Sequence, residues 1–300
     1  MFLYGAKWKS ITSNSEIDKQ DTSYYEIEDT TQLTYYEVRI KKTVHLLSDK
    51  NRFAYNQSNN DFVTLLEEYK KDYGKTIVTG YARIDGWAVG IVANNRELVK
   101  TKTGEMQFGG VIYNDSADKS TRFIANCNQK KIPLVFLQDV TGFMVGSKSE
   151  HGGIIKDGAK MVNAVSNSVV PKFTVVIGNS YGAGNYAMCG KAYDPRLIVA
   201  WPSAELAVMS GNSAAKVLLQ IEKASLEKKG DKITPEKEAE LFNKIKDRYD
   251  NQVSPYYAAA RIWTDAIIYP LDTRNWISMG IEAANHAPIE KPFNLGVLQV

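Results

Sequence analysis

The chain changes from strand to helix within the residues Val175-Val176-Ile177-Gly178-Asn179-Ser180-Tyr181-Gly182-Ala183-Gly184-Asn185-Tyr186-Ala187-Met188. A β-branched run, which favours a strand, ends at a turn of small residues, and a helical stretch follows. Such a turn points successive backbone N–H groups outward, and the N-terminus of the following helix adds a partial positive charge. These groups together can stabilise a developing oxyanion. We therefore expect the chemistry of this chain at the Tyr181–Asn185 turn.

Strand and helix patterns alternate on both sides of this turn. Continuous apolar runs predict strands that are buried on both faces, at residues 133–137, 173–177 and 197–201. Helical periodicity predicts helices over residues 116–129, over residues 154–165 and after Gly184. This alternation predicts a layered α/β core.

The composition of the chain changes near residue 61. The residues before this point are polar, rich in turn-forming residues and without a clear pattern of helix or strand. After it, an Asp85-Gly86 dipeptide separates two apolar-rich runs, which predicts a β-hairpin of residues 76–83 and 87–93. We therefore divide the chain into a divergent polar N-terminal segment, residues 1–61, and a domain of residues 62–300.

The C-terminal third of the chain is predicted to be largely helical. Two charged helices are expected over residues 216–229 and 235–250, and their charges are expected to form solvated faces. Two closing helical segments are expected over residues 255–268 and 273–284.

The bulk composition is that of a soluble globular protein. The chain has 300 residues, 44% hydrophobic and 24% charged, and a net charge of +3 without a basic stripe, which gives no support to a nucleic-acid partner. No apolar run approaches the roughly 18 residues of a membrane span, and residues 1–7 are too short and too weakly apolar for a signal peptide. Cys127 and Cys189 are expected to be reduced, packed thiols. The expectation is a cytoplasmic protein without a membrane partner.

Histidine usage argues against two common chemistries. The three histidines, His45, His151 and His286, show no zinc-binding spacing, and the chain has no G-x-S-x-G nucleophile elbow. We therefore expect no metal site and no Ser-His-Asp catalysis. A chemistry based on backbone donors needs neither.

Four glycine-bearing loops follow predicted strands or precede predicted helices. They comprise residues 139–146, 150–153, 181–185 and 203–211. Loops at strand ends of an α/β core are where ligands usually bind. Gly182-Ala183-Gly184 is not a dinucleotide-binding fingerprint, because no glycine follows three residues later.

Five strings in this order make the chain resemble a known family. It is similar to the C-terminal half of the carboxyltransferase (beta) subunit of biotin-dependent acyl-CoA carboxylases, and in wording it comes nearest to the methylcrotonoyl-CoA carboxylase branch. The strings are Phe136-Leu137-Gln138-Asp139-Val140-Thr141-Gly142-Phe143-Met144-Val145-Gly146, Gly153-Ile154-Ile155-Lys156-Asp157-Gly158-Ala159-Lys160, Ser180-Tyr181-Gly182-Ala183-Gly184-Asn185-Tyr186, Ala200-Trp201-Pro202-Ser203-Ala204-Glu205 and Asp272-Thr273-Arg274.

The resemblance implies a fold and an activity. The fold would be the α/β crotonase-like (ClpP/crotonase) superhelix of ββα units, with residues 62–300 as the C-terminal domain of an acyl-CoA carboxyltransferase. The activity would be carboxyl transfer between carboxybiotin and an acyl-CoA. Biotin would be carried on a partner, a biotin carboxylase or biotin carrier subunit, and none would be bound covalently to this chain. The chain would work in a homo- or hetero-oligomer with an acyl-CoA-binding half.

The resemblance also assigns roles to residues. The backbone N–H groups of Ala183 and Gly184 would hold the ureido oxygen of biotin as the catalytic groups. Tyr186 would lie where relatives differ in acyl specificity; the alternative is an aromatic side chain packed on the core. The other residues expected to contact substrate are Gly142, Phe143, Gly146, Gly153 and Gly182.

Several departures leave alternatives open. Family members have two crotonase-like halves, and this sequence resembles only the second, as a separately encoded half or a truncated product would. Residues 1–61 do not resemble the first half. A non-catalytic or partner-dependent subunit, a biotin-dependent acyl-CoA decarboxylase component, and a crotonase-type hydratase or isomerase using Asp139 or Glu205 are the alternatives. Residues 100–110 are expected to form a solvated loop, with a partner or a CoA phosphate as the other interpretation.

Overall fold

The structure is a computed structural model that describes residues 64–101, 103–228 and 234–298; the predicted segment 1–61 lies outside the described residues. One mixed sheet of eight strands forms its centre, in the order β1-β2-β3-β7-β9-β10-β12, and β11 pairs with β9 beside this path. The strands are β1 (Thr64–Glu68), β2 (Ile77–Ile84), β3 (Trp87–Asn94), β7 (Leu134–Val140), β9 (Lys172–Tyr181), β10 (Leu197–Ala200), β11 (Glu205–Ala207) and β12 (Ala266–Ile267).

The sheet has an antiparallel edge and a parallel body. β1, β2 and β3 are antiparallel neighbours, whereas β3, β7, β9, β10 and β12 run parallel. Two small pairs flank it, antiparallel β4 (Val99–Lys100) with β5 (Met106–Gln107) and parallel β6 (Val111–Ile112) with β8 (Gly142–Phe143). The predicted strands at 133–137, 173–177 and 197–201 are thus β7, β9 and β10.

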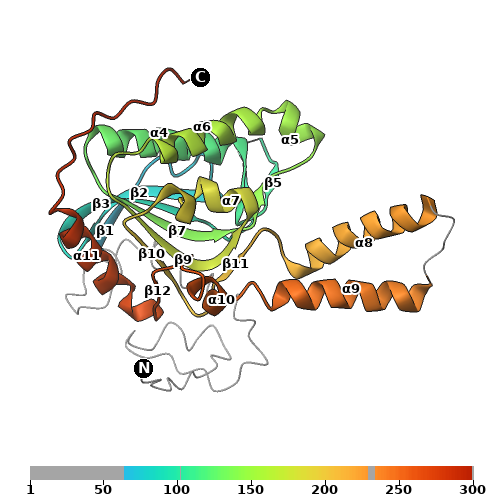
Figure 1. Ribbon diagram of the computed structural model, residues 1–300. Coiled ribbons are helices and arrows are strands. Elements are labelled where there is room, and N and C mark those ends of the chain that lie inside the picture. The colour runs from blue at the N-terminus through green and yellow to red at the C-terminus, as the bar shows by residue number, and fades with distance from the viewer. Residues whose placement is uncertain (1–63, 102, 229–233, 299–300) are drawn as a thin grey trace, which may run out of the picture.

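Helices cover both faces of the sheet, as Figure 1 shows. The helices are α4 (Asn114–Gln129), α5 (Ser147–His151), α6 (Ile154–Ser166), α7 (Gly182–Ala187), α8 (Gly211–Lys228), α9 (Pro235–Asp250), α10 (Pro255–Ala259) and α11 (Thr273–Ala284), with short 3₁₀ turns η1 (Lys191–Tyr193) and η2 (Pro270–Asp272). On one face, Val92 and Phe136 pack with Met161 of α6. On the other, Ile91 packs with Ile277 of α11. Successive strand residues point to opposite faces, so adjacent Ile91 and Val92 serve different layers.

The predicted hairpin turn is confirmed. Asp85 and Gly86 have φ angles of 52° and 84°, the pair of positive values that a type I′ turn requires. The Asp85 carboxylate accepts hydrogen bonds from Ser278 (3.0 Å) and pairs with Arg274 (3.3 Å), so the turn also anchors α11.

One predicted helix is wrong in its extent. Residues 255–268 were expected to be helical, but α10 ends at Ala259 and Ala266–Ile267 forms β12. Ile262 has a φ of 59°, which breaks the helix, and Asp265 then binds β10: its N–H donates to the Ile198 carbonyl at 2.7 Å and its carboxylate accepts from the Ile198 N–H at 2.8 Å. Pairing with the sheet therefore overrides the local pattern.

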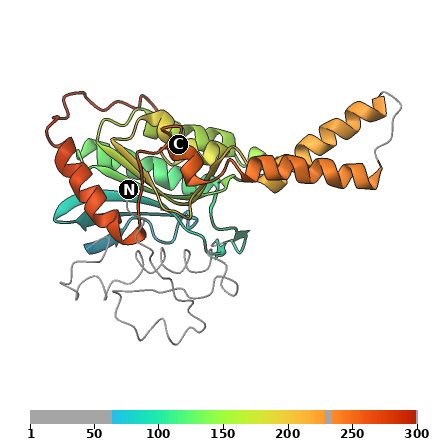
Figure 2. The same cartoon turned by 60° about the horizontal axis from the view of Figure 1, so that its bottom comes forward.

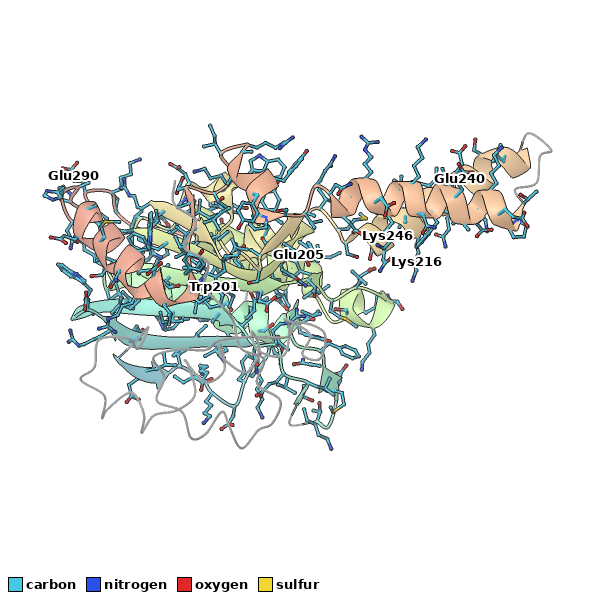
Figure 3. All side chains as sticks on the ribbon, turned by 90° about the horizontal axis from the view of Figure 1, so that it is seen from below. Trp201, Glu205, Lys216, Glu240, Lys246 and Glu290 are labelled. Atoms are coloured by element: carbon cyan, nitrogen blue, oxygen red, sulfur yellow. The ribbon has the colours of Figure 1, made fainter. Side chains whose placement is uncertain are left out.

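The helices α8 and α9 form an antiparallel hairpin that projects from the body of the protein (Figures 1 and 2). Figure 3 shows Lys216, Glu240 and Lys246 on this hairpin. Lys216 and Glu240 are exposed, which agrees with the prediction of solvated charged faces. Across the described part of the chain, no helix combines the length and the apolar character needed to cross a membrane.

Candidate functional site

The strand β9 changes partner along its length. Up to Val176 it pairs with β7 and β10, whereas residues 179–181 pair with β11. Its register with β7 shifts between these parts, because Gln138 lies opposite Val176 but Val140 lies opposite Ser180. The strand therefore carries two extra residues and bends just before the predicted turn.

The turn after β9 starts helix α7. Gly182 has a φ of +50°, the left-handed conformation that favours glycine, and a Cβ there would lie 3.0 Å from the Val208 carbonyl oxygen. The N–H groups of Ala183 and Gly184 belong to the first turn of α7, where no helical carbonyl precedes them. Ala183 is exposed and Gly184 is buried.

Gly184 packs directly against the end of β7 and against β8. A Cβ at Gly184 would lie 2.6 Å from Cγ2 of Val140 and 3.2 Å from Cα of Gly142. The structure thus brings Gly142, Gly182, Ala183 and Gly184 together, as expected. Gly142 itself has a φ of +144°, and a Cβ on it would meet no atom within 4 Å, so its outer side is open.

Phe143 joins this group from β8. Its ring packs on the core and lies 2.8 Å from the position a Cβ would take on Gly158 of α6. β8 is itself paired with β6 through Ile112. The absence of a side chain at Gly158 therefore leaves room for the Phe143 ring against α6.

Gly146 and Gly153 lie apart from this group, at the starts of α5 and α6. Their φ angles are 107° and 95°, and each residue caps its helix. The Asn114 side chain donates to the Gly152 carbonyl at 2.7 Å and holds the junction between the two helices. Gly146 and Gly152 line a cavity of about 670 Å³. Gly146 therefore belongs to the lining of this cavity, whereas Gly153 starts α6 next to it.

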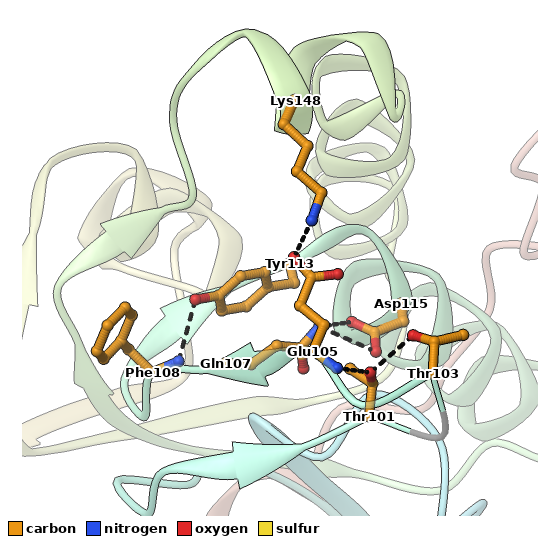
Figure 4. Close-up of polar contacts among 8 residues, drawn as sticks. All are labelled: Thr101, Thr103, Glu105, Gln107, Phe108, Tyr113, Asp115 and Lys148. Carbon is orange, nitrogen blue, oxygen red and sulfur yellow. Dashed lines mark hydrogen bonds and ion pairs between the residues drawn. The ribbon is translucent and has the colours of Figure 1, made fainter.

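The other wall of this cavity is the β4–β5 hairpin (Figure 4). Thr101 Oγ1 accepts from the Glu105 N–H at 3.0 Å, and the Glu105 carboxylate pairs with Lys148 of α5 at 2.8 Å. Gln107 is buried and donates to Asp115 at 3.3 Å. Most described residues of the segment 100–110 are exposed, as expected of a solvated loop, and hydrogen bonds order it as the connection between β4 and β5, with Gln107 and Gly110 buried.

Tyr186 lies on the outer side of α7. It is 49% exposed, and its ring meets Tyr193 edge-on at a centroid distance of 5.9 Å. Burial raises the pKa of Tyr193 above its ordinary value, so this hydroxyl stays protonated at neutral pH. Tyr186 therefore packs on a neighbouring ring and leaves half of its surface exposed, and its place beside the acyl group stays a prediction.

The thiol next to α7 is not a nucleophile. Cys189 is fully buried, and burial raises its pKa to about 11, so it remains a neutral thiol at neutral pH. Cys127 is buried as well, and its pKa is raised to about 12. Both cysteines are free thiols packed in the core, as predicted.

Comparison with known protein families identifies the family of this chain. The carboxyl transferase domain model matches residues 11–296. The chain belongs to the carboxyl transferase family. The match begins well before residue 61, and the division of the chain at that residue stays a prediction.

Relatives of this carboxyl transferase chain include enzymes of different acyl-CoA specificity. The methylcrotonoyl-CoA carboxylase beta chain of Arabidopsis thaliana is 49% identical over 224 residues, 75% of this chain and 36% of that protein. The crystal structure of the P. aeruginosa geranyl-CoA carboxylase beta subunit matches with a TM-score of 0.65 and 36% identity over 79% of this chain and 42% of that one. The transcarboxylase 12S structure, a hexamer with methylmalonyl-CoA bound, matches with a TM-score of 0.66 and 35% identity over the same shares.

These neighbours confirm the crotonase-like α/β fold. The carboxyl transferase chain spans about two fifths of the length of the relatives it matches. Its likeness to the methylcrotonoyl-CoA branch is also confirmed by the identities with that branch.

The two acidic residues of the carboxyl transferase loops are engaged in structural contacts. Asp139 is buried, accepts from the Asn179 N–H at 2.9 Å and pairs with Arg96 at 3.7 Å. Glu205 accepts a hydrogen bond from the Tyr181 hydroxyl. Each carboxylate thus already accepts a hydrogen bond from a residue of β9.

Sequence reasoning missed a buried amide under this turn. Gln138 is bonded to Ser180 and to the Met188 carbonyl, on either side of α7. The available signal was the polar pair Gln138-Asp139 inside the otherwise apolar strand β7, since buried polar groups are rarely unbonded.

Proposed function

We propose that this chain supplies the biotin-side half of a site that transfers a carboxyl group between carboxybiotin and an acyl-CoA. The observation that carries the proposal is the turn from β9 into α7. There the N–H groups of Ala183 and Gly184 are held against β8, with the open side of Gly142 and the Phe143 ring beside them. Family membership and the relatives' names support the reaction class.

The residues around the turn fit a biotin ring. The donors are main-chain N–H groups at a helix N-terminus, which suit the oxygen of a urea that gains negative charge. Phe143 and the exposed side chain of Val145 provide apolar surface for the rest of the bicyclic ring. A side chain at Gly184 would overlap Val140, so the close approach of backbone to β8 depends on glycine.

The chain's own residues would act by binding and alignment. When bound, carboxybiotin supplies the CO2 and, after releasing it, the base that takes the proton from the acyl-CoA. Ala183 and Gly184 would stabilise negative charge on the ureido oxygen, a type of contact typically worth about 3–4 kcal/mol per donor. Gly142, Phe143 and Gly182 would fix the orientation of the ring. Gly146 would line the adjoining cavity, Gly153 would start α6 beside it, and Tyr186 would border the acyl group.

The engagement of the acidic residues disfavours a hydratase or isomerase. Those reactions need a carboxylate over the acyl chain, whereas Asp139 and Glu205 are bound to Asn179 and Tyr181. A decarboxylase would use the same turn to transfer the carboxyl group from the acyl-CoA to biotin, which is the direction that the reverse-transfer assay measures. A non-catalytic subunit would keep the fold and lose the transfer.

The partners we propose follow from the reaction. Biotin would arrive on a biotin carboxylase or carrier subunit, and an acyl-CoA-binding half would face the turn within an oligomer. The relatives are named for methylcrotonoyl-CoA, geranyl-CoA and methylmalonyl-CoA, and the assay determines which acyl-CoA class this chain serves.

The test is reverse carboxyl transfer to free biotin. The purified chain is incubated with biotin and malonyl-, methylmalonyl- or 3-methylglutaconyl-CoA, alone and with the N-terminal half of the A. thaliana relative. We expect loss of the carboxylated thioester that depends on biotin, and the preferred thioester identifies the substrate class. Loss without biotin contradicts carboxyl transfer to biotin, and no loss in either mixture, with a folded chain, identifies a non-catalytic subunit.

A further inference from the structure

A buried amide lies between the two ends of α7. Gln138 of β7 is fully buried. Its Nε2 donates to the Met188 carbonyl at 2.8 Å, and its Oε1 accepts from the Ser180 hydroxyl at 2.7 Å. Ser180 precedes the turn and Met188 follows the helix, so this one side chain ties both ends of α7 to the central sheet.

Asn185 closes the network from within α7. Its Nδ2 donates to Ser180 Oγ at 2.7 Å, and its carbonyl lies 3.5 Å from Nε2 of Gln138. Because Ser180 Oγ accepts from Asn185, its own proton is available for Gln138. The hydrogen bonds therefore run in one direction, from Asn185 through Ser180 to Gln138, and from Gln138 to Met188. Both the amide nitrogen and the amide oxygen of Gln138 are used.

The local backbone explains why side chains are needed here. The register shift between β7 and β9 interrupts the regular ladder between Gln138 and Val140. α7 has six residues, too few for a helix that is stable by itself, and the carbonyl of Met188 just beyond its end takes its hydrogen bond from Gln138. Asp139 satisfies the Asn179 N–H inside the bend, whereas Gln138 reaches past the bend to the helix.

We infer that Gln138 is a positioning residue for carboxyl transfer, because its amide fixes the direction of the Ala183 and Gly184 N–H groups. This inference rests on the proposed function. Gln138 itself is buried beneath α7 and does not reach the open side of the turn. A donor displaced by about 1 Å costs about 100-fold in rate, so a loosened α7 lowers kcat while the KM for the acyl-CoA is unchanged.

Two substitutions at this position separate the hydrogen bonds from the packing. Gln138→Leu keeps the approximate volume and removes both bonds. Gln138→Glu retains an acceptor for Ser180, but its second oxygen faces the Met188 carbonyl and donates to it only when protonated. Burial raises the pKa of such a carboxyl, so the Glu variant recovers as the pH falls, whereas the Leu variant does not.

Asn128 provides a matched control. It is a buried amide in α4 that donates to the Ile124 carbonyl at 2.9 Å and accepts from the Val169 N–H at 2.8 Å. Its contacts lie at the opposite end of β9 from α7, before Lys172. Asn128→Leu therefore removes hydrogen bonds of the same kind at a place that does not contact the turn before α7.

The experiment measures hydrogen exchange of peptides by mass spectrometry, together with kcat and KM for transfer to free biotin. In Gln138→Leu we expect exchange in residues 182–188 to be about tenfold faster, and kcat to fall about 10- to 100-fold, with acyl-CoA KM unchanged. In Gln138→Glu both defects shrink as the pH falls. In Asn128→Leu the faster exchange is confined to residues around 124–128 and 168–170.

Three results would overturn the inference: unchanged exchange in residues 182–188 of Gln138→Leu, a kcat no lower than that of Asn128→Leu, or a Glu variant without pH recovery. If the wild-type chain shows no transfer at all, the proposed function fails. The exchange of residues 182–188 and its pH recovery then still decide whether Gln138 orients α7.

Discussion

Gly184 has no room for even a methyl group. Its Cβ would lie 2.6 Å from Val140 Cγ2, so Gly184→Ala must push α7 away from β8. We expect a loss of stability of about 1–3 kcal/mol from overpacking. We also expect transfer to free biotin to fall about 100-fold, because the N–H groups of Ala183 and Gly184 move with the helix. Urea unfolding and the transfer assay measure the two effects.

Gly90 gives the matched control for this change. It is buried in β3, and its Cβ would lie 2.5 Å from the Cys127 sulfur, so Gly90→Ala causes a comparable overlap away from α7. The Ala variant at Gly90 should lose similar stability and keep its transfer rate once folded. Equal losses of transfer in both variants would mean that Gly184 acts through folding alone.

The sequence identified the small residues of the site but not the side chains beneath them. Gly142, Gly182 and Gly184 stand out locally, because glycine at a strand end has few explanations. Gln138 does not stand out in this way, since its partners Ser180 and Met188 are 42 and 50 residues away and only the folded sheet brings them together. Contacts of this range have no periodic signal.

The α8–α9 hairpin behaves as a separate element. Its two helices pack on each other and are joined by an ion pair between Lys223 and Glu238 at 2.5 Å. The first residue of α8 and the last residue of α9 lie close together, because a Cβ on Gly211 would overlap the Asp250 carboxylate. Replacing residues 212–249 by a short Gly/Ser linker should therefore leave the body folded, with Tm changed by less than about 4 °C. Thermal unfolding followed by circular dichroism checks this.

Deletion of α11 is the contrasting case. Its Ile277 and Ile281 are buried in the core below the sheet, so removing Thr273–Ala284 should prevent folding. A hairpin deletion that is as damaging as the loss of α11 would show that α8 and α9 are part of the folding core.

Elements with strong local signals were predicted with accurate bounds. Residues 273–284 and 235–250 were expected as helices and form α11 and α9, because apolar spacing and the N-terminal Pro235 mark them. β12 was missed, since two residues carry no alternation and Ala266–Ile267 becomes a strand only through β10. The bend of β9 was missed for the same reason: it depends on a second partner strand, β11.

The layers of the whole molecule followed from the apolar runs, because a strand buried on both faces requires helices on both sides. α4, α6 and α11 occupy these positions (Figure 1). The apolar pattern contains no indication of charges inside the layers. Lys119 of α4 is 2% exposed, and its Nζ donates to the Ile77 carbonyl of β2 at 2.9 Å.

This lysine should make the stability of the whole molecule depend on pH. Burial lowers the pKa of Lys119 from 10.5 to about 8, against the opposing effect of Glu68 and Asp115. Between pH 8 and 10.5 the unfolded chain binds more protons at this site than the folded chain, so this group makes stability rise with pH. Its full cost, about 3 kcal/mol, is present below pH 8 and is lost above 10.5.

Lys119→Met removes this titration and keeps most of the packing. The stability that the Met variant gains over wild type should therefore be largest at pH 7. This gain should shrink by about 1.4 kcal/mol per pH unit between pH 8 and 10, because wild type becomes more stable as Lys119 loses its proton. Urea unfolding at several pH values measures it, with Lys71→Met, a change at an exposed lysine, as the control. A difference that stays constant across this range would mean that Lys119 is hydrated in solution and titrates as an ordinary lysine.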